Sequence, residues 1–197
     1  GNGTLSTVPP SQEQVDSYVY DPDNPAPSLG GNNLTVDMGV QDQRPVEERN
    51  DVLVYTSEPL TQSLEVTGPV TVTLWASSSA VDTDFTAKLI DVHPDGYAQN
   101  LLNGIIRARY RDSVATPEMM EAGKPYEFTI DLWATSNVFL PAHCIRLEIS
   151  SSHFPEFDRN LNTGEPFGEG TKWVSAQQTV FHQDDRASYV LLPVIPR

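Results

Sequence analysis

The chain has 197 residues with 27 acidic and 12 basic side chains, a formal net charge of −15. So acidic a chain excludes nucleic acid as a partner, because phosphates need a basic footprint. No apolar stretch approaches the roughly 20 residues of a membrane span, so we expect no membrane association. The length predicts one folded domain with its own core, and the lone cysteine, Cys144, rules out an internal disulfide.

The first residues carry no basic segment followed by an apolar one, so no export signal is visible. Either such a signal has been removed or the chain begins within a longer protein. A single cysteine leaves the redox compartment open. We expect a cytoplasmic rather than a secreted protein.

Residues 1–31 contain prolines at positions 9, 10, 22, 25 and 27. Because proline lacks the backbone donor of a ladder, we expect this stretch to be an extended arm, a linker without regular pairing. Residues 32–197 are then expected to form the folded domain. Residues 33–50 are polar and irregular with a short helix candidate at 45–49, and brief strands are expected at 52–56 and 64–67.

Two alternating runs follow between residues 68 and 90. In the first, Val70, Val72 and Leu74 alternate with threonine and tryptophan, the period of two expected of a strand with one face on a core. The second run repeats this pattern, with apolar residues on one side and mixed residues on the other. Its first side consists of Phe85, Ala87 and Leu89, and its second side of Thr86, Lys88 and Ile90.

A tight turn at residues 93–96 then predicts a hairpin, because Pro94 presets φ and Gly96 accepts a positive φ. The run that follows has an apolar side and a basic side, so we expect a strand that continues to residue 111. The apolar side consists of Ile106, Ala108 and Tyr110, and the basic side of Arg107, Arg109 and Arg111.

The second half of the chain is also rich in short strands. Alternation predicts strands at 126–132, 145–150, 179–182 and 189–194, and the one helix candidate is 117–122. Eight or nine short strands joined by long loops favour an all-β fold, a two-sheet jelly-roll sandwich. The predicted core consists of Val70, Val72, Leu74, Phe85, Leu89, Ile106, Phe128, Ile130, Ile145, Leu147 and Ile149.

Catalytic and metal-binding patterns are weak. The strained Gly-x-Ser-x-Gly elbow of a serine hydrolase does not occur, and the four histidines are isolated in sequence. Turn chemistry explains the aspartates at 82, 84, 91 and 95 better than a calcium site does. A zinc site at Cys144 would need His143, whose side chain should point to the opposite strand face. We therefore assign no catalytic residue, metal or cofactor.

Aromatic residues outside the predicted core suggest contact surfaces. Trp75, Trp133 and Trp173 could form a sugar-binding platform, although burial in the core or at an interface is favoured. The loop at residues 151–173 places large apolar rings among polar residues, which is typical of a loop that is buried against something. Candidate domain-interface residues are Phe154, Phe157, Asp158, Arg159, Asn160, Arg107 and Arg109. A loop that folds back to seal one end of the sandwich is an equal alternative.

Several blocks in one order resemble a known family, from about Gly3 to Pro196. They are YDPDNPAPSLGG at 20–31, DQRPVE at 42–47, DVLVY at 51–55, LEVTGP at 64–69, DTDFTAKL at 82–89 and SSSHFPEFDRN at 150–160. The chain resembles the C-terminal domain of the cocaine esterase and Xaa-Pro dipeptidyl-peptidase (CocE/NonD) family of serine hydrolases.

The resemblance implies a galactose-binding-like jelly roll attached to an α/β-hydrolase domain that carries the Ser-Asp-His triad. The whole enzyme would hydrolyse esters or X-Pro peptides and amides through an acyl-enzyme. This chain would be a non-catalytic domain that packs on the catalytic domain and helps to shape its substrate pocket. The alternatives are an independent carbohydrate-binding module and a purely structural domain that could form a homo-oligomer.

Overall fold

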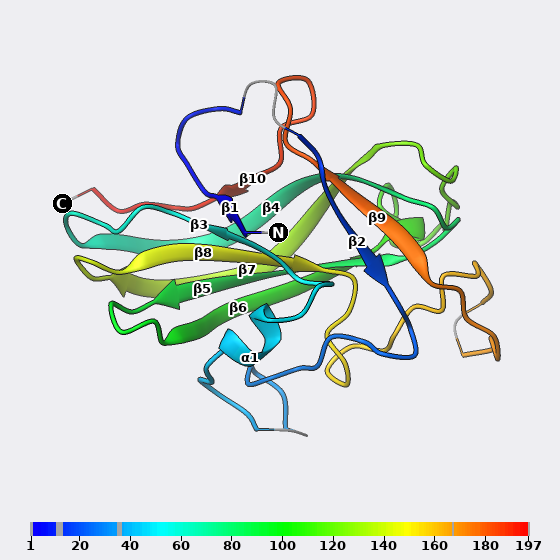
Figure 1. Ribbon diagram of the computed structural model, residues 1–197, viewed down its shortest axis with the longest axis horizontal. Helices are drawn as coiled ribbons and strands as arrows, with labels where there is room; N and C mark the ends of the chain where they lie inside the picture. The colour runs from blue at the N-terminus through cyan, green and yellow to red at the C-terminus, as the bar shows by residue number, and fades with distance from the viewer. Residues whose placement is uncertain (1, 11–13, 35–36, 167, 197) are drawn as a thin grey trace.

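The computed structural model describes residues 2–10, 14–34, 37–166 and 168–196. Two sheets face each other (Figure 1). The first contains, in order, β1 (Asn2–Thr4), β3 (Leu53–Thr56), β8 (Cys144–Ser150), β5 (Asp84–Val92) and β6 (Ala98–Arg107). The second contains β10 (Tyr189–Leu191), β4 (Leu64–Ser78), β9 (Ala176–Phe181) and β2 (Asp16–Tyr20), with β7 (Tyr126–Phe139) paired to β4.

This arrangement confirms the all-β, two-sheet sandwich, while the jelly-roll and galactose-binding-like details stay predictions. The described helical segments are α1 (Arg44–Glu47) and the single 3-10 turn η1 (Ala108–Tyr110). Within the described ranges, no helix has the length and apolar character needed to cross a bilayer.

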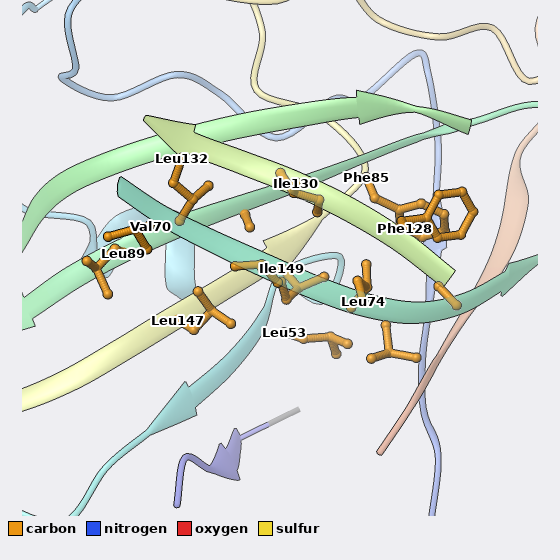
Figure 2. Close-up of a cluster of buried hydrophobic side chains, with 14 of the residues drawn as sticks. Leu53, Val70, Leu74, Phe85, Leu89, Phe128, Ile130, Leu132, Leu147 and Ile149 are labelled. Atoms are coloured by element: carbon orange, nitrogen blue, oxygen red, sulfur yellow. The ribbon is translucent and has the colours of Figure 1, made fainter. Parts of the chain in front are cut away.

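The core lies between the two sheets and contains the predicted residues. All but one of them are buried, and Ile106 is partly buried against the same cluster. Figure 2 shows side chains of both sheets meeting in this layer. The rings of Phe85 on β5 and Phe128 on β7 are 4.9 Å apart between centroids, so they join the sheets directly. Alternation in these strands therefore identified the apolar faces correctly.

The outer face of β5 is covered as well, and all nine residues of this strand are buried. A small apolar cluster of Ala26, Val46, Val52 and Val54 includes the buried side of α1. Lys88 Nζ lies 2.6 Å from Glu148 Oε2 and donates to Gln43 Oε1 at 2.9 Å, which places the residue before α1 over this face. The helix candidate at 45–49 is confirmed as α1, which begins one residue earlier and ends two residues earlier, with proline in the first turn.

Part of the N-terminal segment is integrated in the sandwich. β1 runs parallel to β3, and β2 pairs with β9 along its whole length. Tyr18 and Tyr20 belong to the main core. The expectation that residues 1–31 form no ladder is therefore wrong for β1 and β2, because the prolines flank these strands and do not interrupt them. The role of this segment as a link to a catalytic domain stays a prediction.

Among the described residues, one expected strand is shorter than predicted and one expected helix is not formed. The strand after the hairpin ends at Arg107, because Ala108 and Arg109 turn the backbone inward, where their N–H groups bond to Thr83 O and to the Asp82 carboxylate. Residues 117–122 are not helical either. Their amides donate to other segments, Glu118 to Arg109 O and Met120 to Val81 O, and not to carbonyls one turn back.

Candidate functional site

A cluster of acids and arginines lies where β5 begins and β6 ends. Arg107 donates to the two oxygens of Asp84 at 2.9 and 3.0 Å. Arg109 Nε donates to Asp82 at 2.8 Å. Asn160 Nδ2 reaches both carboxylates, each at 2.8 Å. This acid–arginine cluster, made of these five residues, ties the long loop at 151–173 to the start of β5.

Burial dominates the electrostatics of this cluster. Asp82 and Asp84 are fully buried. Burial raises the pKa of Asp84, and hydrogen bonds from Arg107 and Asn160 reduce this rise without cancelling it. Burial alone would lower the pKa of Arg107, but its carboxylate partners Asp84 and Asp158 raise it further, so the guanidinium is charged. The cluster is therefore a set of internally paired charges.

A groove of about 360 Å³ opens beside the acid–arginine cluster. Six of the seven candidate interface residues line it, namely Arg107, Arg109, Phe154, Asp158, Arg159 and Asn160. The seventh, Phe157, is half-buried and packs near the His153 ring, with centroids 6.1 Å apart.

Arg159, whose partner the sequence left open, donates to Pro22 O at 2.8 Å and lies 4.0 Å from Asp23. Arg107 and Arg109 also bond within the domain. Phe154 is 42% exposed. The loop thus makes contacts of its own with the sandwich, and its role as a domain interface stays a prediction.

A larger groove, of about 490 Å³, lies between residues 29–32 and 39–40 of one loop and the strands β6 and β7. Its lining includes Gly31, Val40, Asn103 and Trp133. Four large apolar side chains on this loop and β7 are exposed, and we call them the apolar rim. They are Leu34, Met38, Val40 and Trp133, with exposed fractions of 86%, 55%, 55% and 74%.

The loop that carries most of this rim is held in place by the backbone. Gly31 and Gly39 exchange two hydrogen bonds of 2.8 and 2.7 Å, which closes the loop at its base. Both have positive φ, 99° and 82°, a conformation that favours glycine. The Asn100 side chain on β6 accepts from Gln41 N at 2.6 Å and donates to Gly39 O at 3.2 Å. The loop is therefore anchored to the first sheet.

Trp133 is presented from β7 by an unusual backbone conformation. Its φ is 66°, rare for a residue with a side chain, and its N–H donates to Asp131 Oδ1 at 2.8 Å. The Gly104 backbone on β6 lies very close to β7 at this point, since a Cβ added to Gly104 would be 2.1 Å from Asp131 O. An exposed tryptophan on a strained backbone is typical of a functional position.

Sequence reasoning missed most of the apolar rim. It described residues 33–50 as polar and irregular, although Leu34, Met38 and Val40 are isolated apolar residues in that polar context. The same signal had marked Phe154 and Phe157. For Trp133 the sequence favours burial in the core or at an interface over a sugar platform, whereas its side chain is 74% exposed. Trp75 is half-buried, Trp173 is exposed elsewhere, and neither lines the groove of Trp133.

A two-sheet sandwich with internally paired charges and an exposed apolar rim is typical of an accessory domain that packs against a partner. Residues 1–191 match the family of the X-Pro dipeptidyl-peptidase C-terminal non-catalytic domain. The chain belongs to this family, which confirms the resemblance read from its sequence blocks.

Individual relatives support the same assignment. The chain is 50% identical to the cocaine esterase of a Rhodococcus species, covering 100% of this chain and 35% of that protein. It superposes on an aminopeptidase from a marine Thaumarchaeota archaeon with a TM-score of 0.90, and on an α-amino acid ester hydrolase with a TM-score of 0.89. Each of these is 34% identical, and the match covers 98% of this chain and 35% of the other.

A CocE/NonD family hydrolase from Staphylococcus aureus shares the fold, with a TM-score of 0.67 at 14% identity. The chain spans about a third of the length of the relatives it matches, 35% of the cocaine esterase.

Proposed function

We propose that this domain packs against an α/β-hydrolase catalytic domain of the same polypeptide and that its apolar rim forms part of the wall of the substrate pocket. The whole protein would then be a serine hydrolase acting on esters, amides or X-Pro peptides. The names of the relatives support this reaction class, since they include two ester hydrolases and an aminopeptidase.

The exposed apolar rim is the observation that carries the proposal. Leu34, Met38, Val40 and Trp133 expose large apolar side chains. Val40 and Trp133 line one groove, and exposed apolar surface on a soluble domain marks a contact site. The loop is closed by Gly31 and Gly39 and anchored by Asn100, so its side chains are presented with little ordering cost on docking. The groove at the acid–arginine cluster, with Phe154 at its edge, is the second candidate contact with the catalytic domain.

A carbohydrate-binding module is the alternative function, and the groove geometry favours it less. Sugar sites stack their ligand on aromatic faces, whereas Trp133 is the one tryptophan among the residues known to line this groove. A homo-oligomer is the third possibility, in which a second copy would cover the rim. Its test is the molecular mass in solution by light scattering.

The proposal is tested in the full-length polypeptide by replacing one of two exposed tryptophans. Trp133→Ala should change kcat/KM for short ester substrates at least fivefold, because it removes a wall of the pocket. Trp173→Ala is the matched control, since Trp173 is 47% exposed but does not line the groove, and it should leave kcat/KM within twofold. Equal kinetics of the two variants would contradict the proposal. Loss of retention on a polysaccharide gel in Trp133→Ala alone would favour the sugar-binding alternative.

A further inference from the structure

Two histidines and an aspartate meet at the end of the sandwich opposite the acid–arginine cluster. Asp91 lies near the end of β5, His93 begins the turn into β6, and His143 directly precedes β8. The turns after β5 and before β8 lie at the left of Figure 1. His143 Nδ1 is 2.8 Å from Asp91 Oδ1, and the two imidazole rings are 4.5 Å apart between centroids. One potential ligand atom of each residue lies within 4.8 Å of the others.

The strand pairing explains why these three residues converge. Asp91 is opposite Ile145 in the ladder between β5 and β8, so side chains two positions before Ile145 and two after Asp91 lie on the same face. His143 and His93 occupy those positions. Asp91 and His143 are 4% and 8% exposed, and His93 is half-buried at the surface. The group is therefore held by the sheet on one side and accessible to solvent on the other.

The donor set has the chemistry of a zinc-type ion. Imidazole nitrogens and carboxylate oxygens bind Zn²⁺ at about 2.0–2.2 Å, so adjacent donors in a tetrahedral site are about 3.3 Å apart. The observed separations of up to 4.8 Å require only a small movement of side chains. The single carboxylate among these ligands also supplies a negative charge that partly offsets that of a dication.

A carboxylate beside a ligating imidazole is a recurrent feature of metal sites. His143 Nδ1 and Asp91 Oδ1 lie 2.8 Å apart, roughly the spacing of adjacent ligand atoms, so both can bind the same ion. His93 has its own polar neighbour, because its Nε2 lies 3.2 Å from Gln99 Oε1. Gln99 thus orients the His93 ring.

We propose that His93, His143 and Asp91 form a binding site for one divalent transition-metal ion of the zinc class, with water in the remaining coordination positions. The ion joins the turn between β5 and β6 to the turn between β7 and β8. Sequence reasoning had placed His143 beside Cys144 in the search for a zinc site. Cys144 instead packs with Ile90, Val92 and Ala98, in an apolar cluster.

A second histidine–aspartate pair provides a matched control. His182 Nε2 lies 3.3 Å from Asp16 Oδ2, which resembles the pair of His143 and Asp91. Among the residues that the structure describes, however, the group of three or more metal-ligating side chains is the one at His93. Replacement of His182 therefore tests whether any histidine of this protein would bind the ion.

The experiment titrates ZnCl₂ into tag-free, chelator-treated chain, followed by calorimetry and by thermal melts with and without the ion. The wild type should bind one Zn²⁺ per chain, and its Tm should rise with zinc concentration, because the ion binds the folded state. His93→Gln, His143→Gln and Asp91→Asn should each weaken zinc affinity at least tenfold. His182→Gln should bind zinc as the wild type does.

Each variant is compared with itself in the presence and absence of zinc, so a loss of intrinsic stability does not affect the interpretation. His93→Gln changes a half-buried turn residue, and its circular dichroism spectrum serves to verify its fold. Wild-type chain without saturable binding at one ion per chain would overturn the proposal. Equal zinc affinities of His93→Gln and His182→Gln would overturn it as well.

Discussion

Arg107 holds the carboxylate of Asp84 through two hydrogen bonds, of 2.9 Å from Nε and 3.0 Å from a terminal nitrogen. Asp84 is 1% exposed, so its carboxylate depends on hydrogen bonds from the protein. Removing one member of a buried ion pair leaves an uncompensated charge, which costs about 3–5 kcal/mol. Arg107→Ala should therefore lower the free energy of unfolding by about that amount in urea titrations. Arg186→Ala, which breaks a solvent-exposed pair with Asp185, should cost less than about 1 kcal/mol, and equal losses would contradict this explanation.

His153 makes the long loop sensitive to acid. Burial lowers its pKa from the usual 6.5, and the neighbouring Glu156 only partly opposes this effect. The unfolded chain then binds a proton more readily than the folded one, so stability is complete above about pH 6.5 and falls as the pH drops towards the folded pKa. The slope in this window can reach about 1.4 kcal/mol per pH unit for one proton.

His153→Gln should remove this part of the slope when the free energy of unfolding is measured between pH 8 and 5. Burial would raise the pKa of Glu156, but hydrogen bonds with His153 and Asn103 lower it overall. The stability that the Glu156 carboxylate contributes is therefore lost only below about pH 4.5. Glu156→Gln removes the carboxylate that favours protonated His153, so the pKa of His153 should fall further. The pH range over which stability is lost through His153 should then extend to lower pH. A slope unaltered in His153→Gln would mean that another group is responsible.

Ala142 lies in a left-handed conformation, with φ of 65°, in the turn between β7 and β8. It is exposed, and the hydrogen bond from its N–H to Leu60 O does not need the methyl group. Ala142→Gly should therefore stabilise the chain by about 0.5–1 kcal/mol, because glycine adopts this conformation without the clash of a Cβ. Gly123→Ala is the reciprocal control. Gly123 has φ of 80° and open space around it, so the alanine should cost about 1 kcal/mol from backbone strain alone.

Arg159 distinguishes a domain interface from a loop that only seals the sandwich. In the isolated chain it contacts Pro22 O and is 41% exposed, so Arg159→Ala should cost about 1 kcal/mol or less. In the full-length polypeptide we expect the same change to weaken association with the catalytic domain and to alter turnover. The effect should be about 2–5 kcal/mol if a charge pair is buried between domains. Equal falls in Tm in both forms, with unchanged activity per folded molecule, would make the interface prediction wrong.

Strands and core could be predicted because a period of two is a local property of the sequence. Val70, Phe85 and Leu147 could be assigned to the core from their neighbours alone. The burial of Lys88 could not be predicted, since the alternation in its strand places it on the side away from the core. Its burial depends on Glu148 and Gln43, which are distant in sequence. The turn at η1 was likewise missed, because the side chain and backbone that cause it belong to Asp82 and Thr83.

The candidate sites show the same limit more strongly. Large aromatic residues in a polar loop predicted a contact surface at Phe154. Leu34 and Val40 are also apolar residues in a polar stretch, but their smaller side chains made the same pattern less evident. The convergence of Asp91 with His143 depends on the register between β5 and β8, which no local pattern predicts. Sequence spacing therefore indicated possible ligands but not which of them meet.

The burial of β5 on both faces also determines how the protein opens. This strand has a hydrogen-bonded neighbour on each side, β8 and β6, the inter-sheet core on one face, and the segment around α1 on the other. Its amides should exchange with deuterated solvent only through complete unfolding, so their rates would measure the global stability of the domain. The amide of Met38, in an exposed loop outside the two sheets, should exchange much faster, whereas that of Gly39 is slowed by its bond to Gly31 O. A deuterium pulse would therefore separate the strand that carries the fold from the loop that we propose as a contact surface.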